Sequence, residues 1–160
     1  MKKTVFILIS VIFMISGCGR AKENVDIKLF YVDSSLNRLL SYNDTIEVSD
    51  ESEIVGAAVD KLIEGRDDTD GIRRLLPNKK GCVKVSVDGS VAYIDLSAEI
   101  LENVPKSRDI ERLIIYQLVN TVTSLKGIRF VRFTVDGTQQ KDFMGFYDMR
   151  EVYKYRYPEW

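Results

Sequence analysis

The chain has 160 residues, 45% of them hydrophobic and 29% charged, and this length suits one domain of ordinary size with an adequate core. Its 23 basic and 24 acidic residues give a formal net charge of −1, which argues against a nucleic-acid partner because such binding needs concentrated positive charge. The chain contains no histidine, so the commonest general base and the commonest transition-metal ligand are both missing.

Residues 1–17 are typical of an export signal. Two lysines give this segment a positive start, and residues 5–15 form a mostly apolar run that is too short for a comfortable membrane span. A branched apolar residue, two small residues and a cysteine follow at positions 15–18, a pattern that resembles a bacterial lipobox. The resemblance implies that Cys18 becomes the first mature residue and carries a diacylglyceryl group, with further acylation by chains such as palmitate. An ordinary signal peptide, or a core cysteine at this spacing by chance, is the alternative.

A lipid on Cys18 would anchor the protein to the extracytoplasmic face of the cell membrane. Each buried CH2 group contributes about 0.8 kcal/mol, so two or three acyl chains make a durable anchor. Without residues 1–17 the chain has 21 basic and 24 acidic residues and a net charge of −3. Residues 18–26 are predicted to be the lipidated N-terminus and a short tether, whose reach of about 26 Å keeps the domain near the membrane.

The first half of the domain is predicted to begin with strands. Residues 27–32 are rich in strand-forming side chains and end at a turn-forming cluster, residues 33–35. Residues 36–42 and 45–48 flank Asn43-Asp44, which suggests a short hairpin with imperfect alternation.

A helix is predicted over residues 52–64. Asp50 and Glu53 resemble a capping box, apolar residues then recur at helical spacing, and Gly65 marks the end. Residues 66–80 mix charges with glycine and proline and are predicted to be an irregular connection.

Alternating apolar residues on both sides of Asp88-Gly89 predict a tight hairpin over residues 83–95. Cys82, which lies at its start, is the only cysteine left once Cys18 is lipidated, so the mature chain has no internal disulfide. We expect Cys82 to be a small, half-buried strand residue, although a reactive or intermolecular thiol is the alternative.

A second helix is predicted over residues 108–125, with Ser107 as its N-cap and Gly127 as its end. Residues 128–135 are predicted to form a last strand, closed by Asp136-Gly137. The element order, β-(ββ)-α-ββ-α-β, predicts an α+β fold with two helices packed on one face of a mixed sheet.

The ordered set of segments over residues 27–150 resembles the GerM-type sporulation and spore-germination domain. The segments that carry the resemblance are residues 27–31, 53–65, 76–77, 83–94, 116–122 and 131–137 and Gly145. The resemblance implies a non-catalytic envelope domain, often on a lipoprotein of spore-forming bacteria, with a fold similar to the ring-building motifs of secretion and sporulation complexes. The family's namesake carries two copies of the domain, and this chain has room for one.

We identify no catalytic residue, metal ligand or cofactor site in the sequence. Residues 68–71 superficially resemble a calcium loop, but that register places Arg66 and Pro77 at the first and twelfth positions, where the loop needs oxygen ligands. Asp95 and Glu99 could form a carboxylate pair, whereas a capping role at the end of a strand is the structural explanation.

The C-terminal tail, residues 151–160, alternates aromatic and basic residues. Tyr153, Tyr155, Tyr157 and Trp160 could grip a protein partner, a glycan strand or the membrane interface. The alternative, which period-two alternation favours, is a last edge strand that lays its tyrosines on the sheet.

Together these features predict a non-catalytic, lipid-anchored envelope protein that acts by protein binding or assembly in sporulation or spore germination. Its expected partners are the membrane, through Cys18, and a membrane-proximal envelope protein or further copies of the chain. A small-ligand-binding lipoprotein and a regulator of a cell-wall enzyme are the alternatives.

Overall fold

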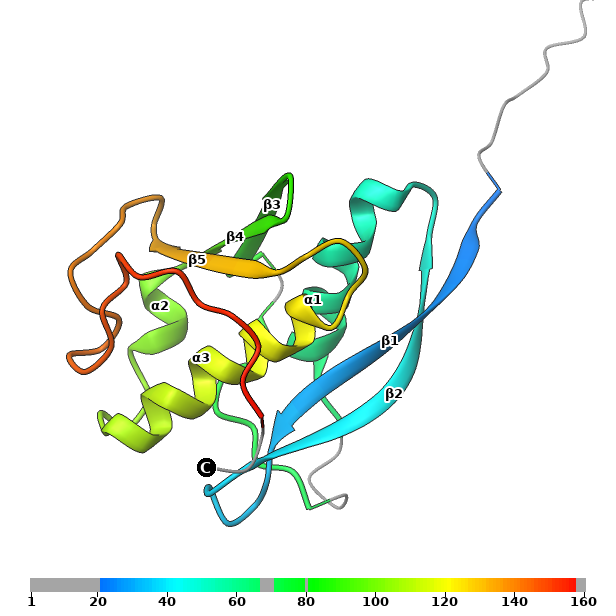
Figure 1. Ribbon diagram of the computed structural model, residues 1–160. Coiled ribbons are helices and arrows are strands. Elements are labelled where there is room, and N and C mark those ends of the chain that lie inside the picture. Colours follow the sequence, from blue (N-terminus) through cyan, green and yellow to red (C-terminus); the bar gives the residue numbers. More distant parts are fainter. Residues whose placement is uncertain (1–20, 67–70, 80, 158–160) are drawn as a thin grey trace, which may run out of the picture.

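The computed structural model describes residues 21–66, 71–79 and 81–157 (Figure 1). Cys18, Trp160 and most of the calcium-loop-like segment therefore lie outside the described residues. No helix within the described ranges has the length and apolar character needed to cross a membrane.

The first two strands form one long antiparallel hairpin. β1 (Glu23–Val32) pairs with β2 (Leu39–Val48) along its whole length, from Glu23 opposite Val48 to Val32 opposite Leu39. β1 thus starts four residues earlier than predicted, and residues 23–26 belong to the sheet rather than to a tether.

The predicted short hairpin around Asn43-Asp44 is wrong, because both residues lie in the middle of β2. The turn lies instead at residues 33–38, where the Asp33 carboxylate accepts hydrogen bonds from the Ser35 hydroxyl and the Asn37 N–H. The alternation of β2 looks imperfect in the sequence because Asp44 faces inward, where Lys61 of the first helix pairs with it at 3.7 Å.

Both residues of the predicted capping box bond to the backbone before the first helix, but Asp50 caps a 3-10 turn and the reciprocal pattern of a capping box is not formed. A short 3-10 turn, η1 (Glu51–Glu53), leads into α1 (Ile54–Glu64). The Asp50 carboxylate accepts from Ser52 N–H at 3.0 Å, and the Glu53 carboxylate accepts from Ser49 N–H at 2.9 Å. Gly65 ends the helix with a φ of 75°, a conformation that glycine adopts without steric cost.

The second sheet contains three strands in the order β3-β4-β5. β3 (Val83–Asp88) and β4 (Val91–Leu96) are antiparallel, and β5 (Phe130–Val135) runs parallel to β4. The predicted hairpin is confirmed, but its turn lies one residue later than expected, at Gly89-Ser90, since Asp88 still pairs with Val91. Cys82 is buried just before β3 and is a free cysteine, more deeply buried than we expected.

Two helices connect β4 to β5, as a parallel crossover requires. The short α2 (Ala98–Leu101) precedes α3 (Arg108–Thr123), whose predicted N-cap is confirmed because the Ser107 hydroxyl accepts from Ile110 N–H at 3.1 Å.

The α+β class is confirmed, but the strands form two sheets where we predicted one. α1 contacts β1, β2 and β3, and α3 contacts α1, β1 and β5, so the two long helices join the sheets into one core (Figure 1). Side chains of α3 occupy part of the outer edge of β1: Thr121 Oγ1 accepts from Phe30 N–H, and Ser124 Oγ donates to the Lys28 carbonyl. A helix therefore lies where a third strand of that sheet would pair.

Candidate functional site

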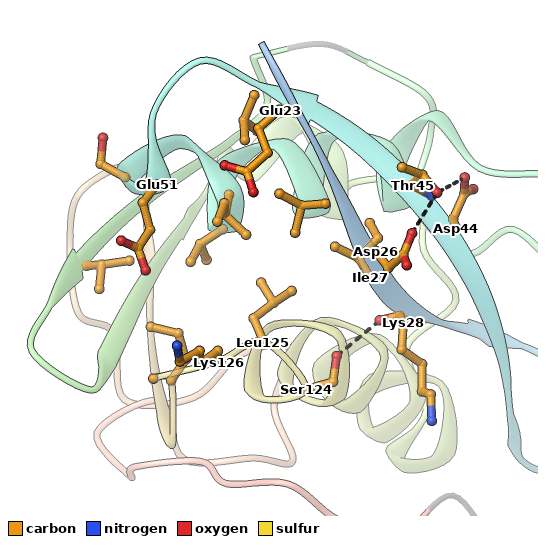
Figure 2. A pocket seen from close by; sticks show the side chains of 18 of the residues that line it. Glu23, Asp26, Ile27, Lys28, Asp44, Thr45, Glu51, Ser124, Leu125 and Lys126 are labelled. Atoms are coloured by element: carbon orange, nitrogen blue, oxygen red, sulfur yellow. Dashed lines mark hydrogen bonds between the residues drawn. The ribbon is translucent and has the colours of Figure 1, made fainter. Parts of the chain in front are cut away.

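An open groove of about 1220 Å³ lies beside the first half of β1. Its walls come from five parts of the chain: β1, β2, the start of α1, the β3–β4 turn and the loop between α3 and β5. Figure 2 shows Glu23 and Glu51 on one side of this space, with Leu125 and Lys126 on the other. The groove therefore exists only once the two sheets and the helices have packed together.

The floor of the groove is apolar and its rim is charged. Buried aliphatic residues that are 5–8% exposed form the floor: Ile27, Val48, Val55, Leu125 and Ile128. The rim carries four carboxylates against two ammonium groups, from Glu23, Asp26, Asp44 and Glu51 and from Lys28 and Lys126. The excess of negative charge favours a ligand that carries positive charge.

Two of the four carboxylates have hydrogen-bond partners within the hairpin. Asp26 Oδ1 accepts from the Thr45 hydroxyl at 3.1 Å, and Asp44 Oδ1 accepts from Thr45 N–H at 2.8 Å (Figure 2). Neither Glu23 nor Glu51 forms an ion pair with another described residue. These two exposed carboxylates are therefore available to a basic ligand, and so is Asp26, which is also exposed and bonds to Thr45 through Oδ1 alone.

Among the described residues, no group of three or more Cys, Asp and Glu side chains is placed to hold a metal ion. Burial, the largest cause, raises the pKa of Tyr31, a core residue, to about 12. This shift is explained by packing in the core.

Asp95 and Glu99, considered above as a carboxylate pair, have separate partners. Asp95 Oδ1 accepts from the Thr134 hydroxyl and from Gly137 N–H, both at 2.7 Å, and Glu99 pairs with Lys79. Asp95 does cap a backbone segment, but this is the turn after β5 rather than a helix. Asp136 accepts from Ala98 N–H at 3.2 Å and so holds the start of α2.

The tyrosines of the tail have three different environments. Tyr153 is buried, exchanges two backbone hydrogen bonds with Val131 of β5, and packs its ring 5.5 Å from that of Phe133. Tyr155 is 40% exposed and touches Phe30, whereas Tyr157 is 79% exposed. The predicted edge strand is thus reduced to a single bridge, and only Tyr155 and Tyr157 remain accessible.

Two buried polar residues of α3 bind the C-terminal region, and neither was predicted from the sequence. The Glu111 carboxylate, fully buried, accepts from Phe146 N–H at 3.1 Å and from Tyr147 N–H at 2.8 Å. Asn120, also fully buried, donates to the Arg156 carbonyl at 2.7 Å and accepts from Arg156 N–H at 3.0 Å. The signal was present for Asn120, since a polar pair interrupts the apolar run over residues 118–122.

Comparison with known proteins identifies relatives of this fold. The family model described as "Germane: Sporulation and spore germination" matches residues 28–141. A protein from Clostridium perfringens that is assigned as a lipoprotein has a similar structure, with a TM-score of 0.58, 19% identity and coverage of 82% of this chain and 87% of that one. A search of curated protein sequences found no match.

Two structures of the sporulation protein GerM from Bacillus subtilis are also similar. Its first GerMN domain gives a TM-score of 0.56 at 20% identity and covers 78% of this chain and 92% of that one. Its tandem GerMN domains give a TM-score of 0.59 at 20% identity, over 79% of this chain but only 44% of that one. This chain thus spans somewhat less than half of the tandem protein.

Proposed function

The chain belongs to the Germane family of sporulation and spore-germination domains, and from this premise we propose that it is a lipid-anchored envelope protein that acts by binding other proteins. The observation that carries the proposal is the family match, which extends over residues 28–141 and so includes the second half of β1, the other four strands and the two long helices. Membership links the chain to sporulation and spore germination, and the family is not a known enzyme family.

Binding rather than catalysis is the role that suits the groove. Pockets for small molecules usually enclose about 300–1,000 Å³ and bury most of the ligand. This groove is larger, at about 1220 Å³, and it is open along the hairpin. An open groove with an apolar floor and an acidic rim suits a segment of protein better than a small molecule.

The lipid anchor is supported by the lipobox pattern that ends at Cys18 and by the similarity to a protein assigned as a lipoprotein. Metabolic labelling with an alkyne analogue of palmitate tests it directly. We expect the full-length chain and its Cys82→Ala variant to be labelled, because Cys82 is buried, and the Cys18→Ala variant to remain unlabelled. Equal labelling of the Cys18→Ala variant would show that the anchor lies elsewhere.

The role in sporulation is tested by deleting the gene in its source bacterium and counting heat-resistant spores and germinated spores. We expect a deficit that the full-length chain restores and that the Cys18→Ala variant restores poorly. Crosslinking in sporulating cells should then capture an envelope protein. The identity of that protein distinguishes a structural partner from a cell-wall enzyme that the chain would regulate. Normal spore counts and normal germination in the deletion strain would refute the proposed role.

A further inference from the structure

The outer edge of β1 is open where it faces the groove. In an antiparallel hairpin, backbone groups of successive residues point alternately toward the partner strand and away from it. The backbone groups of Lys28 and Phe30 point away from β2, because they bond to Ser124, the C-cap of α3, and to Thr121 within α3. Asp26 and Asn24 lie two and four residues before Lys28, so their backbone N–H and C=O groups also point away from β2, toward the open side.

The open stretch covers the first half of β1 only. Farther along, Arg73 N–H donates to the Val32 carbonyl, Thr121 Oγ1 accepts from the Phe30 N–H, and Ser124 Oγ donates to the Lys28 carbonyl. No hydrogen bond joins the backbone N–H or C=O of Asn24 or Asp26 to another described residue outside the hairpin. An unpaired strand edge of this kind is a template for another strand.

We propose that this edge binds an extended segment of a partner protein by strand addition, in which apolar residues alternate with lysine or arginine. The segment would pair with residues 24–28 and lie in the groove. The proposal rests on the proposed binding function and names the chemical class of the partner segment.

The two faces of β1 differ, and this difference specifies why apolar and basic side chains should alternate in the partner segment. Ile27 is buried and shares the groove floor with Leu125 and Ile128, so an incoming side chain on that face meets an apolar surface. Asp26 is exposed on the other face, where a basic side chain across the new ladder would meet its carboxylate. Glu23 and Glu51 add negative charge on one side of the groove (Figure 2).

Charge also decides between a foreign segment and a second copy of β1. A second β1 that pairs about Asp26 would place this carboxylate beside its own copy, and like charges directly opposite each other destabilise a strand pair. Lys28 is the single cation of β1, so a second β1 could face Asp26 with a cation in one register only. A segment in which lysine or arginine alternates with apolar residues places a cation there in each register, so the edge favours a basic partner over a second copy.

The test uses the full-length protein in detergent and a fluorescent peptide of roughly eight residues in which valine alternates with lysine, the length of an ordinary strand. We expect saturable binding by fluorescence anisotropy with a Kd below about 1 mM. A peptide of the same composition with its lysines in one block, and one with glutamate in place of lysine, should bind at least about ten-fold more weakly. Equal binding of all three peptides, or no binding of the first, overturns the proposal.

Variants separate backbone pairing from charge. Asp26→Pro removes the N–H at a strand edge that tolerates proline, and the loss of one or two hydrogen bonds should weaken peptide binding about five- to thirty-fold. Asp26→Asn keeps the N–H and should have a smaller effect that disappears at high salt. Ser41→Pro, on the outer edge of β2 and outside the groove, is the matched control and should bind like the parent protein.

Amide hydrogen exchange provides a readout that does not depend on variants that fold. Binding of the peptide should slow exchange at Asp26 and Lys28, whereas binding elsewhere would leave these amides unchanged and overturn the proposal. A chain that is dimeric, and that becomes monomeric with Asp26→Pro, would overturn it in favour of self-pairing. If crosslinking in sporulating cells captures the same partner with Asp26→Pro as with the parent, the proposed function stands and strand addition fails.

Discussion

The isosteric substitution Glu111→Gln tests whether the buried carboxylate of α3 holds the C-terminal loop in place. The Glu111 side chain is fully buried, and its two oxygens accept the N–H groups of Phe146 and Tyr147, at 3.1 and 2.8 Å. Glutamine keeps the shape but offers one acceptor and one NH2 group, which would face an N–H donor. One charge-assisted bond is lost and one N–H is left without a partner.

The expected cost follows from these two losses. A hydrogen bond to a charged group contributes about 1.5–3 kcal/mol, and an unpaired buried donor adds to the penalty, so we expect destabilisation of about 2–4 kcal/mol. At about 4 °C per kcal/mol for a domain of this size, the Tm should fall by roughly 8–16 °C. The substitution also removes the desolvation cost of burying a carboxylate, so we expect a loss of stability near the lower end of this range.

Denaturant unfolding followed by circular dichroism measures the loss, and hydrogen exchange at Phe146 and Tyr147 locates it. Glu102→Gln, an exposed glutamate at the end of α2, makes the same chemical change and should stay within about 0.5 kcal/mol of the parent protein. If Glu111→Gln is as stable as Glu102→Gln, the two backbone bonds contribute nothing and the reasoning is refuted.

Three further predictions concern the tail and pH. Truncation after residue 151 should lower the Tm, because the Tyr153 bridge and ring contacts are lost; an unchanged Tm would mean that the tail is an appendage available for binding. Asn120→Leu removes both bonds to Arg156 and should cost about 2 kcal/mol in denaturant unfolding, with Lys154→Ala as an exposed control. Burial raises the pKa of Tyr31 to about 12, so the neutral phenol stabilises the fold fully below pH about 10, and this contribution is lost as the pH rises toward 12. In a plot of the free energy of unfolding against pH, Tyr31→Phe should therefore flatten the part between pH about 10 and about 12. An unchanged slope would show that Tyr31 does not cause the loss.

Local signals in the sequence predicted the elements that local interactions determine. Asp50 with Glu53, and Ser107, bond to backbone groups within three or four residues, so their spacing alone identified the helix starts. The Asp88-Gly89 hairpin was predictable for the same reason, since its turn and its alternation lie in one short segment. In each case the residues that form the interaction lie within one short segment of the chain.

The remaining features depend on residues that are far apart in the chain. The sequence Asn43-Asp44 is typical of a turn, yet both residues lie within β2, because β2 pairs with β1 along its whole length. Asp44 also pairs with a lysine of α1. The buried Glu111 would be assigned to a solvated helix face, because its partners come from a loop more than thirty residues later. The groove could not be predicted either, since five separate segments form its walls.

The bond between Phe30 N–H and Thr121 Oγ1 joins residues 91 positions apart, and it has a consequence for the rate of folding. Bringing such distant segments together costs loop-closure entropy before any contact is gained, so chains rich in these pairings fold slowly. The β1–β2 hairpin can form early, but its edge stays bare until α3 has been made and has docked. During that interval the hairpin is open to incorrect pairing with other chains, and refolding yield should therefore fall as protein concentration rises.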